Sequence, residues 1–169
     1  MYHISTATGT GSAGAFSFSS IPQNFTHLQL RISAREVGTS NVLFHYFNGD
    51  FAATNYTWTT FSAQGTAAAV GSGGPSGFFN TQAHPSNSEL ANTNGVVIID
   101  ILDYSNTSKA KTIKMLGGYN LGSTPGYLAI TGGTWNSTAA INSYVLTPGF
   151  STNSRADLYG LTTSSATGA

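Results

Sequence analysis

The segment THLQLRISAR, residues 26–35, decides the fold class of this chain. Its apolar residues fall on every second position, at Leu28, Leu30, Ile32 and Ala34, and polar residues fill the positions between them. A period of two is typical of a β-strand that buries one face and exposes the other. The segment therefore predicts a strand with one face in a core and one polar face.

Similar short stretches of β-branched and aromatic residues recur along the chain, separated by residues that favour turns. The pair Asn48-Gly49 suits a tight hairpin. Because residues 95–103 alternate large aliphatic side chains on both faces, we expect a central strand that is covered on both sides. Together these patterns predict strands at residues 42–47, 55–61, 78–79, 95–103, 110–116, 126–131, 140–147 and 155–161.

Glycine-rich and aperiodic stretches mark the expected loops. Residues 71–77, with sequence GSGGPSG, predict a mobile surface loop, and residues 81–94 predict a long connection. The pair Gly132-Gly133 is expected to end the strand at 126–131. No window of eleven or more residues has helical periodicity. We therefore expect an all-β, jelly-roll-like sandwich of two antiparallel sheets, with about nine or ten strands and little or no helix. It forms a single domain over residues 1–161, followed by a frayed tail at 162–169.

Charged residues are scarce in this sequence. Lys and Arg total 6 and Asp and Glu total 6 among 169 residues, a charged fraction of 7% where a typical domain has about 25%. A neutral chain offers no electrostatic attraction for nucleic acid or an anionic membrane, so we expect neither partner. It also has little self-repulsion, which favours a surface that contacts other proteins.

The ionisable residues do not predict an enzyme or a metal site. The six carboxylates show no pairing of the kind that glycosidases need, the four histidines have no metal-ligand spacing, and no Gly-x-Ser-x-Gly nucleophile motif occurs. Cysteine is absent, which excludes disulfides and thiolate ligands. We therefore expect no catalysis, no metal and no cofactor. The ionisable residues considered are Glu36, Asp50, Glu89, Asp100, Asp103, Asp157, His3, His27, His45 and His84.

Aromatic residues are more numerous than a thin sandwich needs for one core: the chain has 10 Phe, 8 Tyr and 2 Trp. Some of them are candidates for a platform that stacks on sugar rings, and Trp58 and Trp135 are the strongest members. The alternative is that most aromatic residues are core residues or anchors at a subunit interface.

Five segments in order resemble a group of bacteriophage virion proteins. They are FSFSSIPQNFTHL at 16–28, DYSNTSK at 103–109 followed by KT at 111–112, GTWNSTAAI at 133–141, LTP at 146–148 and ADLYG at 156–160. Together they span about residues 15–161. The resemblance implies a jelly-roll-like module of phage head, minor-tail or tail-fibre proteins, without a known active site. It also implies structural roles for motif residues: Asn106 and Gly133 in turns, and Trp135, Ile141, Leu158 and Tyr159 in the core.

The resemblance leads to a functional expectation. Because the chain shows no shaft or tail-anchoring region like those of the longer fibres, we expect a small capsid decoration or cement protein. It would be made in the host cytoplasm and bind the major capsid protein or other virion proteins as a trimer. The glycine-rich stretch 71–77 and the connection 81–94 are its candidate contact loops. The alternative is a tail-fibre or tail-tip module that binds a receptor or host glycan through Trp58, Trp135 or loop tyrosines.

Overall fold

The computed structural model describes residues 1–52, 54–82, 84–120 and 125–162. The described residues contain strands and turns, and none of them forms a helix that would be long and apolar enough to cross a membrane. The strands are β1 (Tyr2–Thr8), β2 (Phe16–Phe18), β3 (His27–Ala34), β4 (Val42–Phe47), β5 (Tyr56–Gln64), β6 (Ala67–Ser76), β7 (Phe79–Gln82), β8 (Gly95–Leu102), β9 (Lys111–Tyr119), β10 (Tyr127–Trp135), β11 (Tyr144–Thr147) and β12 (Arg155–Leu161).

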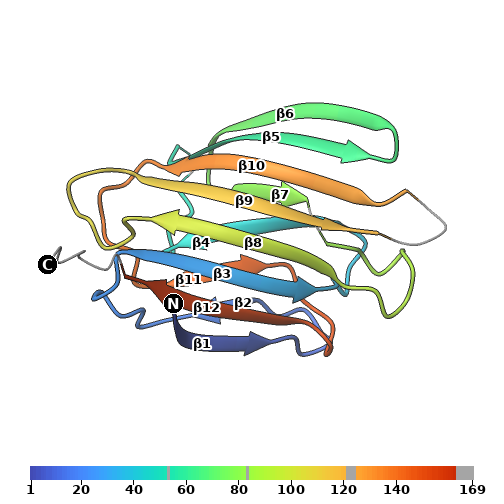
Figure 1. The fold of residues 1–169 in the computed structure, drawn as a ribbon, viewed down its shortest axis with the longest axis horizontal. Coiled ribbons are helices and arrows are strands. Elements are labelled where there is room, and N and C mark those ends of the chain that lie inside the picture. Colours follow the sequence, from blue (N-terminus) through green and yellow to red (C-terminus); the bar gives the residue numbers. More distant parts are fainter. Residues whose placement is uncertain (53, 83, 121–124, 163–169) are drawn as a thin grey trace, which may run out of the picture.

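The strands form a two-sheet antiparallel sandwich, which confirms the predicted fold class. The large sheet has eight strands in the order β1-β12-β3-β8-β9-β10-β5-β6, and the small sheet has four in the order β2-β11-β4-β7. Figure 1 shows the large sheet in front and the small sheet behind its lower and central part. From β2 to β5 successive strands change sheet each time. This alternation joins the two layers around one core.

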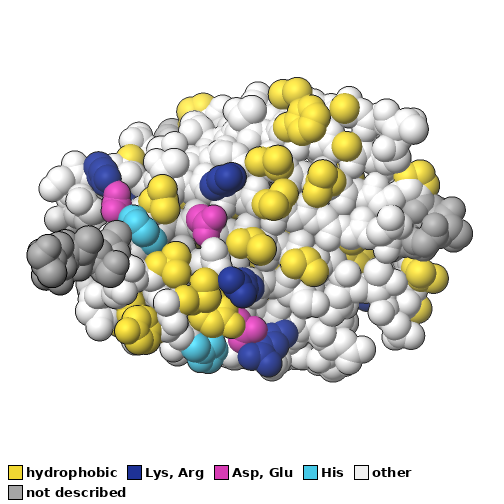
Figure 2. Space-filling model, viewed as in Figure 1, with side chains coloured by type: hydrophobic (Ala, Val, Ile, Leu, Met, Phe, Trp, Pro, Cys, Tyr) yellow, Lys and Arg dark blue, Asp and Glu magenta, His cyan; other side chains and the backbone are white. Residues whose placement is uncertain are grey.

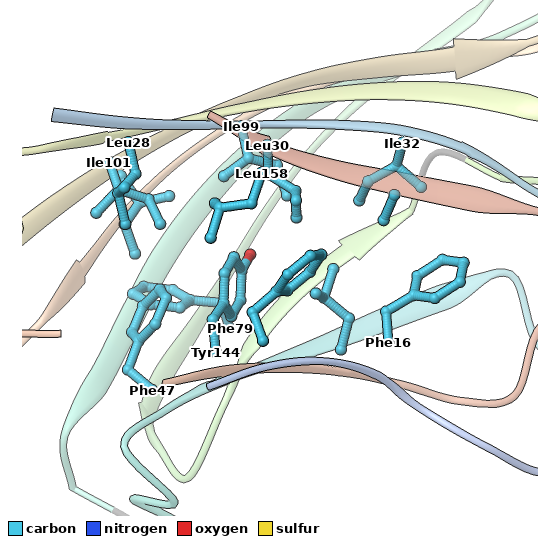
Figure 3. Packing of buried hydrophobic residues seen from close by; sticks show 14 of the residues in the cluster. Phe16, Leu28, Leu30, Ile32, Phe47, Phe79, Ile99, Ile101, Tyr144 and Leu158 are labelled. Atoms are coloured by element: carbon cyan, nitrogen blue, oxygen red, sulfur yellow. The ribbon is translucent and has the colours of Figure 1, made fainter. Parts of the chain in front are cut away.

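The hydrophobic core lies between the two sheets. Leu28, Leu30 and Ile32 of β3 point down from the large sheet (Figure 3) toward aromatic rings of the small sheet, among them Phe47 and Tyr144. All five side chains are buried. The alternation that is visible in residues 26–35 therefore places its apolar face in the core, as predicted.

The structure has twelve strands where the sequence predicts nine or ten. The additional strands are β1, β2 and β6. The prediction of a loop at residues 71–77 is wrong, because β6 runs through this stretch and pairs with β5 at the edge of the large sheet. An edge strand needs backbone partners on one side only, and glycine permits the close approach of the Trp58 ring to Gly73, where an added Cβ would lie 2.0 Å from the ring.

The prediction that Gly132-Gly133 ends a strand is also wrong. β10 continues through both glycines to Trp135, paired with β9 on one side and β5 on the other. A Cβ at Gly133 would lie 2.5 Å from Cε1 of Phe79, so glycine is required here by packing and not by a turn. The strand predicted at 140–147 is shorter, since β11 spans Tyr144–Thr147. Of the tail predicted at 162–169, residues 163–169 lie outside the described residues.

Candidate functional site

An apolar surface covers part of the outer face of the large sheet. Two rows of side chains cross β8, β9, β10, β5 and β6 in register: Ile98, Leu116, Ile130, Phe61 and Val70 in one row, and Val96, Gly118, Leu128, Ala63 and Ala68 in the next. Neither row contains a charged residue on these five strands. We call these ten residues the apolar sheet face. In Figure 2 hydrophobic side chains gather over these strands.

The prediction that β8 is covered on both sides is wrong. The aliphatic residues of β8 predict a strand that is covered on both sides, but only its inner residues, such as Val97 and Ile99, are buried. On the outer side Val96 is 55% exposed and Leu102 is 48% exposed. The alternation of residues on β8, β9 and β10 could have predicted an apolar outer face, because each of these strands has apolar residues on its second face as well.

An open groove runs along the second row of the apolar sheet face, from β8 to β5. The groove has a volume of about 990 Å³ and is lined by residues of four strands, among them Val96, Leu116, Gly118, Leu128 and Ala63. Because Gly118 lacks a side chain, the row Val96–Gly118–Leu128 has a gap in its centre. Beside the groove, in the first row, Phe61 of β5 is 52% exposed and Val70 of β6 is 74% exposed.

Charged residues lie mostly beside this apolar sheet face, toward β3 and β12 and around the 103–109 turn (Figure 2). Arg155 donates hydrogen bonds to both carboxylate oxygens of Asp157, at 2.7–2.9 Å. Gln29 Nε2 donates to Asp100 Oδ1 at 2.8 Å, and Arg31 Nε donates to Gln29 Oε1 at 2.9 Å. Arg155 and Asp157 are therefore paired with each other, whereas Lys114 of β9 is exposed and lies opposite Asp100 of β8 in the row next to the apolar sheet face.

A second apolar surface lies on the opposite side of the molecule. Phe44 and Tyr46 project from the outer face of β4, and Phe78 packs edge-on against Phe44 with ring centroids 4.7 Å apart. Phe51 contacts Tyr46 at 4.7 Å, and Trp58 contacts Phe78 at 5.9 Å. Of these five side chains, which we call the aromatic cluster, Phe51 is the most exposed, at 64%.

The structure separates the two tryptophans that were predicted to stack on sugars. Trp58 is half-buried and lines a groove of about 310 Å³, formed where β5 and β6 extend beside β7. Hydroxyl groups of Thr60, Ser62 and Ser72 and the amide of Asn80 line the same groove. An aromatic ring beside hydroxyl and amide groups is a chemistry that suits a sugar.

Trp135 is a core residue, so its prediction as a sugar-stacking residue is wrong. It is 2% exposed, and its Nε1 donates a hydrogen bond to Asp50 Oδ2 at 2.7 Å. Asp50 also accepts from Asn55 Nδ2 at 2.7 Å and from the Ala52 N–H at 2.9 Å. Burial opposes ionisation of Asp50, but these three hydrogen bonds outweigh it and lower the pKa of the carboxyl group. The pattern that would have revealed this role is the resemblance, which implies a core position for Trp135.

Most of the remaining motif residues lie where the resemblance implies, with two exceptions. Ile141 and Leu158 are fully buried, and Asn106 lies in the turn after β8, where its side chain accepts from the Ser108 N–H at 2.7 Å. Tyr159, however, lies half-buried on the outer face of β12, where the Arg31 guanidinium sits 5.6 Å from the centre of its ring. Gly133 is the other exception, inside β10 and not in a turn.

The carboxylates and histidines do not meet in a groove. The buried acid–base pair is Glu36 and His84, whose Oε2 and Nε2 atoms lie 3.4 Å apart, but both side chains are enclosed and offer no access to a substrate. His27 lies on β3 and His45 on β4, in different sheets. In the described part of the chain, no group of three or more His, Asp or Glu side chains is placed to hold a metal ion.

His45 is a satisfied core histidine. Its Nδ1 lies 2.7 Å from the Tyr144 hydroxyl and its Nε2 lies 2.9 Å from the Thr81 hydroxyl. Burial lowers the pKa of His45 to about 3, with a further contribution from the charge of His84.

Comparisons with known proteins add no relative to this description: no family model, no curated protein and no solved structure matches the chain. The resemblance to phage virion proteins therefore depends on the five ordered motifs alone.

Proposed function

We propose that the chain is a structural protein of a bacteriophage virion, a decoration or cement protein that binds the surface of the head as an oligomer. The observation that supports this best is that the sandwich exposes apolar side chains on both of its outer faces. A subunit of an assembly needs such contact surfaces, whereas a monomeric protein seldom exposes large apolar patches. The five ordered motifs supply the connection to virions.

Adhesion is the mechanism that follows from these surfaces. Burying apolar side chains against a neighbouring protein contributes about 25 cal/mol for each Å² removed from water. Many copies on one regular lattice add avidity, so modest contacts hold a shell of subunits in place.

The test is to find the protein on particles. We expect purified virions that carry this gene to contain many copies, on the head fraction after heads and tails are separated, measured by quantitative mass spectrometry. Immunogold labelling should mark capsids and not tail tips. Virions without the protein, or with a few copies at the tail tip only, would refute the decoration role.

A second function is favoured by the groove beside Trp58. In this alternative the chain is a tail-fibre or tail-tip module that binds a host glycan, with the Trp58 ring against a sugar face and Asn80 donating to its hydroxyl groups. The groove of about 310 Å³ has room for a small saccharide unit.

Glycan binding is tested with Trp58→Ala and a matched control, Phe61→Ala, which removes a half-exposed ring from the other face of the molecule. Binding of the wild type on a broad glycan array, lost in Trp58→Ala and kept in Phe61→Ala, supports the second function. A silent array with folded protein contradicts it.

A further inference from the structure

We infer that the ligand of the Trp58 groove is an uncharged polysaccharide chain, which continues from the groove across the aromatic cluster as far as Phe51. This inference deepens the second proposed function and rests on it, because it names the class of glycan and further contact residues. The groove lies where the large sheet extends past the small one: β7 is the edge strand of the small sheet, and β6 lies beyond it (Figure 1). The inner face of β5 and β6 therefore lines the groove.

The groove presents polar side chains that have no partner within the protein. Among the described residues, none forms a hydrogen bond with the side chains of Ser62, Ser72 or Asn80, which line it. Thr60, by contrast, shares a hydrogen bond of 2.8 Å with the Thr131 hydroxyl. Two hydroxyl groups and one amide can each donate and accept a hydrogen bond. The hydroxyl groups of a sugar need partners of both kinds.

Trp58 is held in place beside these polar groups. Its ring lies against Gly73 of the neighbouring strand, where an added Cβ would lie 2.0 Å from the ring. The ring also contacts Phe78, with ring centroids 5.9 Å apart. A ring that is already held by two neighbours loses little conformational freedom when a ligand binds against it. It can therefore serve as a fixed apolar surface for the C–H face of a sugar.

The aromatic cluster continues this surface beyond the groove. From Phe78 the contacts lead to Tyr46, with ring centroids 6.3 Å apart, and from Tyr46 to Phe51, with ring centroids 4.7 Å apart. Successive rings are tilted by 32–68°, so they form a row of separate surfaces and not one flat plane. Each spacing is close to the length of one sugar unit. Such a row fits a single polysaccharide chain better than it fits a flat crystalline surface.

Charge determines the class of saccharide. Residues 37–88, which include the aromatic cluster and all of the groove except Tyr127, contain no Lys or Arg and one acidic residue, Asp50. The Asp50 carboxylate already accepts three hydrogen bonds within the protein, one of them from Trp135 Nε1. An acidic sugar would place an anionic group on this surface without a cation of the segment to pair with it, which is costly. The segment therefore favours an uncharged sugar.

The first experiment measures binding of the full chain to soluble polysaccharides by affinity electrophoresis. The panel contains neutral glucan, mannan and galactan, and acidic alginate, hyaluronate and heparin. We expect at least one neutral polymer and none of the acidic ones to retard the protein. Calorimetry with fragments of the bound polymer should then give a dissociation constant at least about tenfold lower for six sugar units than for two, because the longer fragment contacts more of the row.

Three variants locate the two ends of the bound chain. Phe51→Ala should raise the dissociation constant of the six-unit fragment about tenfold and leave that of the two-unit fragment unchanged. The matched control is Phe61→Ala, which should change neither value: Phe51 is 64% exposed and Phe61 is 52% exposed, but Phe61 lies on the apolar sheet face. Trp58→Ala should abolish binding of both fragments. Circular dichroism melting checks that each variant is folded.

The outcomes separate this inference from the function on which it rests. Tighter binding of an acidic polymer, equal affinity for the two fragments, unchanged affinity in Phe51→Ala, or an equal loss in Phe61→Ala would overturn the inference, while glycan binding in the Trp58 groove would stand. A panel to which the folded protein does not bind would overturn both. None of these results depends on finding the protein on a virion head.

Discussion

His45 makes the stability of this protein depend on pH. The ring is fully buried between the Tyr144 and Thr81 hydroxyls, and its pKa is lowered from 6.5 to about 3. The folded state therefore holds His45 neutral at a pH where the unfolded chain binds a proton. Unfolding takes up that proton between pH 6.5 and 3, so the free energy of unfolding falls as the pH falls through this range and is unaffected by His45 above it.

The magnitude follows from the difference between the two pKa values. Each pH unit below 6.5 costs about 1.4 kcal/mol until the folded-state pKa is reached. Between pH 7 and pH 5 the loss due to His45 is about 2 kcal/mol. For a domain of this size, that corresponds to a fall of about 4–8 °C in the melting temperature.

The assay is urea unfolding at pH 7 and pH 5 for the wild type, His45→Gln and Tyr144→Phe. His45→Gln removes the titrating group, so its stability should fall by about 2 kcal/mol less than that of the wild type over this interval. Tyr144→Phe loses one hydrogen bond but keeps the buried imidazole. It should be weaker by about 1 kcal/mol at both pH values and keep the pH dependence of the wild type. Equal pH dependence in the wild type and His45→Gln would refute the reasoning.

Two further predictions concern the core beside the aromatic residues. Gly133→Ala should lower the free energy of unfolding by about 1–3 kcal/mol, since its Cβ would press on Phe79, whereas Gly132→Ala, with nothing within 4 Å, should change it by less than about 0.5 kcal/mol. Urea midpoints measure both, and equal effects would contradict the packing role. Asp50→Ala should cost about 2 kcal/mol because it leaves Trp135 Nε1 without its acceptor. An unchanged melting temperature would show that this bond contributes little.

Local alternation predicted most of the sandwich. Residues 27–34 and 95–102 form strands as expected, since their apolar residues repeat every second position. β1 and β6 were not predicted, because an exposed edge strand has few core residues and therefore a weak alternation of apolar and polar residues. Figure 1 shows both strands at the edges of the large sheet. At Gly133 a neighbour far away in sequence, Phe79, determines the residue type, which no local pattern reports.

The candidate surfaces were harder to predict than the strands. The aliphatic face of β8 was predictable, but whether it lies in the core or outside depends on which sheet covers it. The same is true of Trp58 and Trp135, because nothing in the sequence around them shows which of the two is buried in the core. One lines a groove, and the other is held in the core by Asp50.

The position of β12 has a consequence for biosynthesis. It lies between β1 and β3, so the two earliest strands of the large sheet meet through one of the last to be made. While the ribosome is still adding residues before 155, β1 has no partner in this sheet and one side of β3 is open. The large sheet is therefore completed only after β12 emerges, and pairing over so long a stretch of sequence is of the kind that slows folding.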